Sequence, residues 1–355
     1  MSYFPLLTIF PTDYRVYFIL LILPFALVKM IDKVRVRHNP SVSLFALFFI
    51  ILYSVFVLYE GYYEKFIRLA PLITVYSLFI SRVECSEGSY AALKKVLTVI
   101  VLYVLFSTLL IAIGEPIAIK VRDFLYPISE NVRGDPSFNS YSNFRSVRFA
   151  GIYYNPNVLG GLAFIILIGF YELFNPKLFS KYFYLLVFPS QLLIFLSGSR
   201  VYLVALMVFY FLRVYKEGGT LKWTISFIAP LLLIMMPALI SGFSEGGSMS
   251  IKFAIIYDYL SNSTALEIIF GSLNQEIAFD AEYFFYLGNY GVIVLLSVFY
   301  LYFYLFFYAG FSKPFVVSLF ITGFANTVFY NFFYFSVLFV IMFFVLNRGK
   351  NITSR

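Results

Sequence analysis

Long apolar runs separated by short polar stretches are the feature that most constrains how this chain can fold. About 20 mostly apolar residues cross the hydrocarbon core of a membrane, and the sequence offers many such runs. Of its 355 residues, 61% are hydrophobic and 12% are charged, whereas a soluble domain carries roughly 25% charged residues. The sequence therefore predicts one integral membrane domain over residues 1–355, and not several globular domains.

The apolar runs between charged residues predict an all-α polytopic fold with about 11 (10–12) transmembrane helices. The run from Met1 to Tyr14 is broken by Pro5 and Pro11 and is left outside the count, although it would supply a twelfth element. A removable signal peptide is not expected, because no A-x-A type cleavage site follows an apolar segment. The expected spans lie near 15–31, 41–59, 66–81, 96–114, 157–173, 183–199, 200–212, 223–241, 284–309, 315–330 and 332–346.

The basic residues predict how these spans are oriented. If the spans alternate, 16 of the 26 Lys and Arg residues fall on one side, which is the cytoplasm by the positive-inside rule and also holds the C-terminus. The other side holds most of the acids and two long polar segments, about 115–156 and 242–283. Because loops on a rigid scaffold often carry function, we expect the working site on the extracytoplasmic face. Within the second loop, Ile251 to Ile269 reads as an amphipathic helix on the membrane surface.

Several classes of site lack support in the sequence. The chain has one cysteine, Cys85, and one histidine, His38, so no disulfide within the chain and no Cys/His metal site is expected. The net charge of +8 is dispersed among the spans, which sets nucleic acid aside as a partner. No nucleotide-binding or zinc-protease motif occurs, so we expect no cofactor and no metal.

The first candidate motif runs from Arg145 through Arg148 and Gly151 to Asn155-Pro-Asn157, at the outer end of a span. Arginine presents a planar fork that binds phosphate oxygens in pairs. Asn157 is a plausible N-cap, and a helix that starts after it adds backbone donors and partial positive charge. The motif predicts a phosphate site; the alternative is that the arginines only contact lipid headgroups.

The second motif is Ser199-Arg200, between two apolar runs on the same outer side. A charge at membrane depth is costly unless it is paired or used, so Arg200 is a candidate binding residue. The alternative is an arginine that reaches up from a tight turn to the headgroups.

The third motif, Asp280-x-Glu282-Tyr283, lies where the second outer loop returns to the membrane. A carboxylate there would accept the proton of a sugar hydroxyl, with its pKa raised by partial desolvation. The alternative for both acids is a solvated loop or an ion pair with an arginine. Tyr283 is a candidate substrate contact, although aromatic residues are spread through the whole chain and mostly fill spans and interfaces.

In this order, the motifs resemble the O-antigen and capsular polysaccharide polymerases of the Wzy type, which are related to the O-antigen ligases. The resemblance rests on Arg-x-x-Gly-x-x-x-Asn-Pro-Asn from Arg148, on Ser199-Arg200, and on acid-x-x-Tyr…Gly from Asp280 to Gly291. It covers the middle and later thirds of the chain.

The resemblance implies a glycosyltransferase of the bacterial inner membrane that acts on an undecaprenyl-pyrophosphate-linked oligosaccharide without metal. Carried onto this chain, Arg148 and Arg200 would hold the pyrophosphate, with Asp280 as the third catalytic residue. Substrate binding would involve Arg145, Asn155, Asn157, Lys252, Glu282 and Tyr283. Membrane lipids surround such a protein, and the resemblance also allows a chain-length regulator protein as a partner.

Three departures bear on this interpretation. Lys252 stands where many relatives have arginine, and it lacks the planar fork. Gly271 resembles the first glycine of the family's Phe-Gly-x-Gly turn, but Leu273 replaces the second. Ligases typically use a histidine where Asp280 stands, and His38 lies on the cytoplasmic side. This favours polymerase, with a ligase or a flippase of the lipid-linked unit as alternatives.

Overall fold

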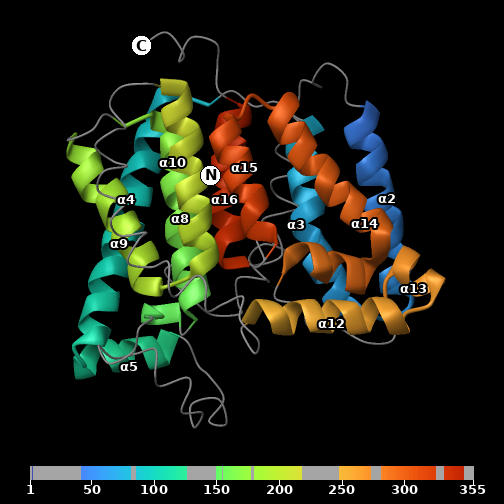
Figure 1. Ribbon diagram of the computed structural model, residues 1–355. Helices are drawn as coiled ribbons and strands as arrows, with labels where there is room; N and C mark the ends of the chain where they lie inside the picture. Colours follow the sequence, from blue (N-terminus) through green and yellow to red (C-terminus); the bar gives the residue numbers. More distant parts are fainter. Residues whose placement is uncertain are drawn as a thin grey trace. The chain divides into compact units, whose positions relative to one another are not determined.

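A computed structural model describes residues 2, 41–80, 85–125, 149–153, 155–176, 180–217, 248–272, 281–324 and 332–347 (Figure 1). Within these ranges the regular structure is helical, and no strand occurs. The helices are α2 (Ser41–Tyr59), α3 (Tyr63–Ile80), α4 (Glu87–Ala112), α5 (Pro116–Leu125), η3 (Gly151–Tyr153), α8 (Pro156–Phe174), η4 (Phe183–Val187), α9 (Phe188–Ser197), α10 (Arg200–Glu217), α12 (Ser248–Asn262), α13 (Ala265–Phe270), α14 (Glu282–Phe307), α15 (Lys313–Gly323) and α16 (Phe332–Leu346).

Three of the described helices, α4, α8 and α14, are long and apolar enough to cross a membrane. The coarser prediction, a helical membrane protein, agrees with this finding. Helices α2, α8 and α16 begin and end within one residue of the spans expected for them, because in each the apolar run and the helix coincide. The expected spans near 15–31 and 223–241 lie outside the described residues, so the full number of spans stays a prediction.

Among the other described helices, α10 continues to Glu217, five residues past its expected span, and α4 and α15 depart furthest from theirs. Helix α4 begins at Glu87, nine residues before the expected span, because Ser86 caps it by accepting a hydrogen bond from the Ser89 amide. Its first turns therefore carry polar residues that a hydropathy reading leaves outside the membrane. Helix α15 ends at Gly323, and residues 325–330 of its expected span lie outside the described part.

The described residues form two compact units. Unit 1 draws on residues 1–37, 81–203 and 331–355, and its centre is α8, which packs against α9 and α16 (Figure 1). Gly160 and Gly169 let these neighbours approach, since an added Cβ would collide with Ser197 of α9 or with Ile341 of α16. Small residues at such crossings are typical of helix packing in membranes.

Unit 2 draws on residues 38–80 and 204–330, and it pairs α2 with α3 and α13 with α14. Helix α14 is broken at Gly291, whose φ of 77° is non-helical, so its first nine residues form a separate helical segment (Figure 1). The bend lies where the second outer loop was expected to return to the membrane.

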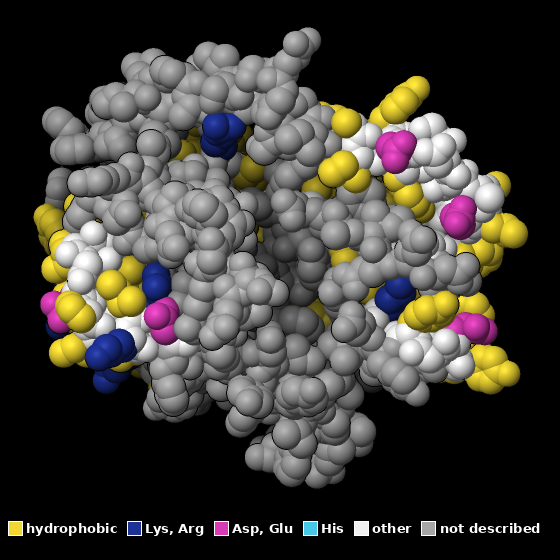
Figure 2. Space-filling view, turned by 90° about the horizontal axis from the view of Figure 1, so that it is seen from below, with side chains coloured by type: hydrophobic (Ala, Val, Ile, Leu, Met, Phe, Trp, Pro, Cys, Tyr) yellow, Lys and Arg dark blue, Asp and Glu magenta, His cyan; other side chains and the backbone are white. Residues whose placement is uncertain are grey.

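The stretch from 251 to 269 was predicted as one amphipathic helix, and this expectation was wrong in one respect. It forms two helices, α12 and α13, because Thr264 and Glu267 make a capping box that starts a new helix. Helix α12 runs crosswise to α2 in unit 2, as α5 runs crosswise to α4 in unit 1 (Figure 1). On the face that Figure 2 shows, charged side chains of the described residues lie among hydrophobic ones.

Candidate functional site

The first two motifs meet in unit 1 at the starts of two helices. The N-cap of α8 is Asn155 and not Asn157, so that prediction was wrong: Pro156 already takes the first helical position, and the Asn155 side chain accepts a hydrogen bond from the Asn157 amide over 2.8 Å. Ser199 precedes α10, and its carbonyl oxygen accepts from the Leu203 amide. The Ser199 hydroxyl donates to Asn157 Oδ1 over 3.0 Å. This bond joins residues 42 positions apart in the sequence. We define the helix-start site as the four residues Asn155, Asn157, Ser199 and Arg200.

The turn from Ser197 to Arg200 is shaped by its small residues. Gly198 adopts a left-handed conformation with φ of 57° and ends α9, which allows the chain to reverse into α10. Ser197 is fully buried, and its hydroxyl donates to the Ile194 carbonyl while it accepts from the Ser199 amide over 3.2 Å. Ser199 is thereby fixed from both sides, by the turn and by Asn157.

The segment that leads into α8 is anchored at the same place. The Phe149 amide donates to the Leu196 carbonyl over 2.8 Å. Two residues on, Gly151 has a φ of 57° and lies against Thr108 of α4, where an added Cβ would collide with the threonine hydroxyl. Tyr153 is fully buried. Two contacts and the burial of Tyr153 therefore fix the backbone just after Arg148.

The electrostatics of the helix-start site favour an anion. The N-terminus of a helix carries roughly half a positive charge. Here the starts of two helices, α8 and α10, are joined by the hydrogen bond between Ser199 and Asn157. Arg200 is the first residue of α10 and is half-buried, so a cationic residue stands at one of these two helix starts. Asn155 is exposed, so the site is open on that side.

Several predicted site residues fall outside this description. Arg145, Arg148 and Asp280 lie outside the described residues. Lys252 lies in α12, but its side chain is outside the description. Their roles stay predictions.

The acidic motif begins α14 in unit 2. Glu282 is fully buried at the helix N-terminus, which is a favourable place for a carboxylate. It lies close enough to Tyr283 and Tyr302 to interact electrostatically with both. Tyr283 is 3% exposed, and its hydroxyl donates to the Phe320 carbonyl over 2.6 Å. Tyr283 thus has a packing role here, and its role as a substrate contact stays a prediction.

A backbone contact fixes the start of α14, and sequence reasoning did not foresee it. An added Cβ at Gly271 would collide with the Asn289 backbone, and one at Gly291 would collide with the Ile269 backbone. Both glycines have positive φ, so this reciprocal contact, the Gly271–Gly291 junction, admits no larger residue at either position.

Lys65 was also missed by the sequence reading. Its side chain is 5% exposed, and Nζ donates to the Ser272 carbonyl, next to the Gly271–Gly291 junction. The ammonium lies 5.5 Å from the centre of the Tyr62 ring, and the Lys65 carbonyl accepts from the Tyr290 hydroxyl over 2.9 Å. The only signal in the sequence was a lysine on the outer side directly before a span.

Comparisons with known proteins add no name to these features. No family model matches the chain, and neither a curated protein nor a solved structure matches it.

Proposed function

We propose that this protein is a polysaccharide polymerase that moves a lipid-diphosphate-linked glycan chain onto the next lipid-linked repeat unit. The proposal places it among the Wzy-type polymerases of O-antigen or capsule biosynthesis, as a metal-independent glycosyltransferase. The lipid would be undecaprenyl pyrophosphate, and the reaction would occur at the outer face of the bacterial inner membrane.

One observation carries this proposal, the hydrogen bond from Ser199 to Asn157. It brings together the Asn-Pro-Asn motif and the Ser-Arg motif, which the resemblance assigns to the same pyrophosphate. Arg148 directly precedes Phe149, whose amide is bonded to Leu196 four residues before Arg200. Arg200 and the two helix starts, with Arg148 next in sequence to Phe149, would suit a diphosphate with several negative charges.

The proposed reaction has a defined balance of bonds. A hydroxyl oxygen of the acceptor unit attacks the anomeric carbon of the donor chain, and the bond from that carbon to the diphosphate oxygen breaks. The electron pair leaves with the lipid diphosphate, whose growing charge Arg148 and Arg200 would neutralise. Asp280 would take the hydroxyl proton as general base.

The proposal also includes the finer features of the membrane topology. These are about 11 transmembrane helices, two long extracytoplasmic loops near 115–156 and 242–283, and a cytoplasmic C-terminus. The helix-start site would then face outward, where nucleotides are scarce and the energy for transfer must come from the lipid-linked substrate.

Two other functions would use the same anion site. A ligase would transfer the glycan to a lipid A core, and a flippase would move the lipid-linked unit across the membrane without joining it. No observation on the described residues favours either one, so both serve as outcomes of the test.

Purified full-length protein, given lipid-linked repeat units in detergent or vesicles, tests the proposal. The expected product is a ladder of longer lipid-linked chains, formed with chelator present and without nucleotide. An Asp280→Asn variant keeps the shape of the side chain but cannot accept a proton, and it should give no ladder. Units that remain single with the wild-type protein under matched lipid conditions would contradict the polymerase assignment.

A further inference from the structure

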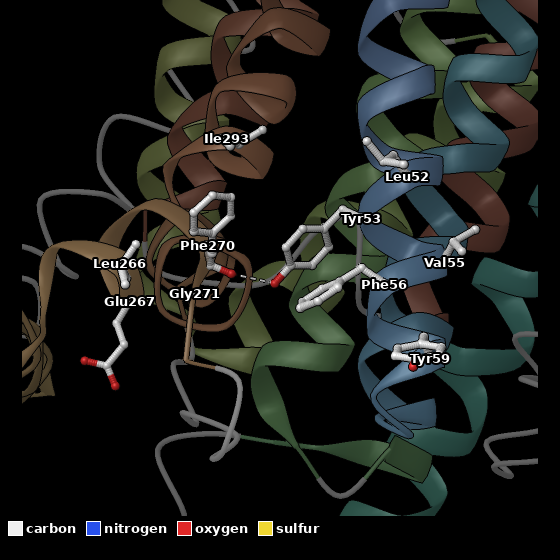
Figure 3. A pocket seen from close by; sticks show the side chains of 10 residues that line it. All are labelled: Leu52, Tyr53, Val55, Phe56, Tyr59, Leu266, Glu267, Phe270, Gly271 and Ile293. Atoms are coloured by element: carbon white, nitrogen blue, oxygen red, sulfur yellow. Dashed lines mark hydrogen bonds between the residues drawn. The ribbon is translucent and has the colours of Figure 1, made fainter.

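An apolar groove with a volume of about 820 Å³ lies in unit 2, between α2 and α13. Figure 3 shows Leu52, Val55 and Tyr59 of α2 on one side of the groove and Leu266 with Phe270 on the other. A volume of this size is typical of sites for small molecules and lipids, roughly 300–1,000 Å³.

Hydrogen bonding and backbone packing fix the two walls of the groove relative to each other. The Tyr53 hydroxyl donates across the groove to the Phe270 carbonyl over 2.6 Å, as the dashed line in Figure 3 shows. Behind Phe270, the Gly271–Gly291 junction fixes the end of α13 to α14 through backbone contacts. These contacts set the position of both walls.

The open side of the groove continues an exposed apolar surface of α2, a helix that the sequence predicts as a membrane span. Leu52 is 54% exposed and Val55 57% exposed, and the opposite wall exposes Leu266 at 68%. Apolar side chains of this kind on a membrane-embedded helix contact hydrocarbon. The chemistry that matches the interior of the groove is therefore an acyl chain.

The rim of the groove carries a negative charge. Glu267 lies in the first turn of α13 and lines the groove. Figure 3 shows its carboxylate pointing away from the interior. The Thr264 amide and hydroxyl both donate to Glu267 Oε2, over 2.8 and 2.9 Å, and hold the pKa of this carboxyl below its usual value. The described residues that line the groove include no Lys or Arg. This charge would repel a lipid diphosphate and attract a cation.

We propose that this groove holds one acyl chain of a phospholipid whose headgroup carries an ammonium group, with that ammonium beside the Glu267 carboxylate. The chain lies against Leu52, Val55 and Phe270, and the headgroup lies at the start of α13. This inference does not depend on the polymerase assignment, because it uses only unit 2 and a lipid that is present in the membrane.

Quenching of tryptophan fluorescence by brominated phospholipids tests the proposal. Trp223 is the only tryptophan of the chain, so a Trp223→Phe background allows one reporter to be placed at will. Phe56→Trp puts the reporter in the groove at a side chain that is 41% exposed, and Phe106→Trp puts it on the exposed face of α4 as the matched control. Leu52→Trp serves as a second groove reporter if Phe56→Trp folds poorly.

Each full-length variant is reconstituted with brominated phosphatidylethanolamine or brominated phosphatidylglycerol of the same chain length. We expect the groove reporter to favour the ethanolamine lipid by about 1.4-fold to fivefold, the range set by one exposed ion pair. Adding Glu267→Gln should remove that preference, and the control reporter should show none. Equal quenching by the two lipids in the groove would overturn the proposal, and so would stronger quenching there by a brominated polyprenyl phosphate.

Discussion

The helix-start site in unit 1 and the Gly271–Gly291 junction in unit 2 are both contacts between distant parts of the chain, but they are built differently. At the helix-start site, side chains make the contact, since the Ser199 hydroxyl reaches Asn157 at an edge where Asn155 is exposed. At the junction, backbone meets backbone, and the buried Lys65 donates to the Ser272 carbonyl beside it. The first contact is made by side chains beside an exposed residue, whereas the second joins two backbone segments and holds helices together.

The difference predicts that substitutions in the two regions will separate activity from stability. Changes at the helix-start site should mainly affect turnover, and changes at the junction should mainly affect folding. The following predictions run from the largest expected effect to the smallest.

Arg200→Lys should lower polymerisation by about 100-fold or more, because lysine keeps the charge but cannot bind a diphosphate with two parallel hydrogen bonds. The rate of chain extension by purified protein is the measurement. Arg213→Lys is the control, since Arg213 is buried in the same helix thirteen residues from Arg200. Full activity of the Arg200→Lys variant would reduce Arg200 to a headgroup anchor.

Gly291→Ala should destabilise unit 2 by about 3 kcal/mol or more, because a Cβ at φ of 77° is strained and collides with Ile269. The loss is measured as a fall in the thermal midpoint by size-exclusion chromatography with fluorescence detection. Gly88→Ala is the matched control: Gly88 lies in α4 with only the Ser86 hydroxyl 3.9 Å from an added Cβ. If both variants melt like the wild type, the junction does not hold α13 to α14.

Ser199→Ala should cost about 1 kcal/mol of stability, the usual net contribution of one hydrogen bond, and it should also lower turnover, since it removes the bond that joins the two motifs. Ser190→Ala provides the control in the same unit. Ser190 is fully buried, but its hydroxyl has no hydrogen-bond partner within the described part of the chain. Equal activity of the two variants would contradict the claim that the contact between the Asn-Pro-Asn and Ser-Arg motifs supports activity.

Acid should loosen the start of α13. The pKa of Glu267 is lower in the folded protein than its usual value, because Thr264 donates to the ionised form. The cap is therefore at full strength above the unfolded pKa, about 4.3, and is lost as the pH falls through the lower, folded pKa. The protection of the first amides of α13 against hydrogen exchange, taken relative to the intrinsic exchange rate at each pH, should fall over that range in the wild type. The Glu267→Gln variant should show no such step, and an identical step in it would assign the change to another group.

The sequence predicted the helices of the described spans well because hydropathy decides them, as α8 and α16 show. It also selected Asn157 and Ser199, but not their contact, which depends on how α9 reverses at Gly198. The role of Lys65 could not be predicted, because its partner is a backbone carbonyl 207 residues away. Every residue has such a carbonyl, so the residue pattern does not indicate which one is the partner. The break between α12 and α13 did have a signal, since Thr264-x-x-Glu267 is a capping box pattern.

The assignment of function depends most directly on the surface glycan of cells that carry or lack this gene. Cells with the gene deleted are compared on a gel with deletion cells complemented by wild type or by Arg148→Ala. The account predicts a single repeat unit on its acceptor after deletion, a full ladder restored by wild type, and no ladder restored by Arg148→Ala. If deletion removes even the single unit from the acceptor, the protein acts in transport or ligation, and the proposed polymerase function is wrong.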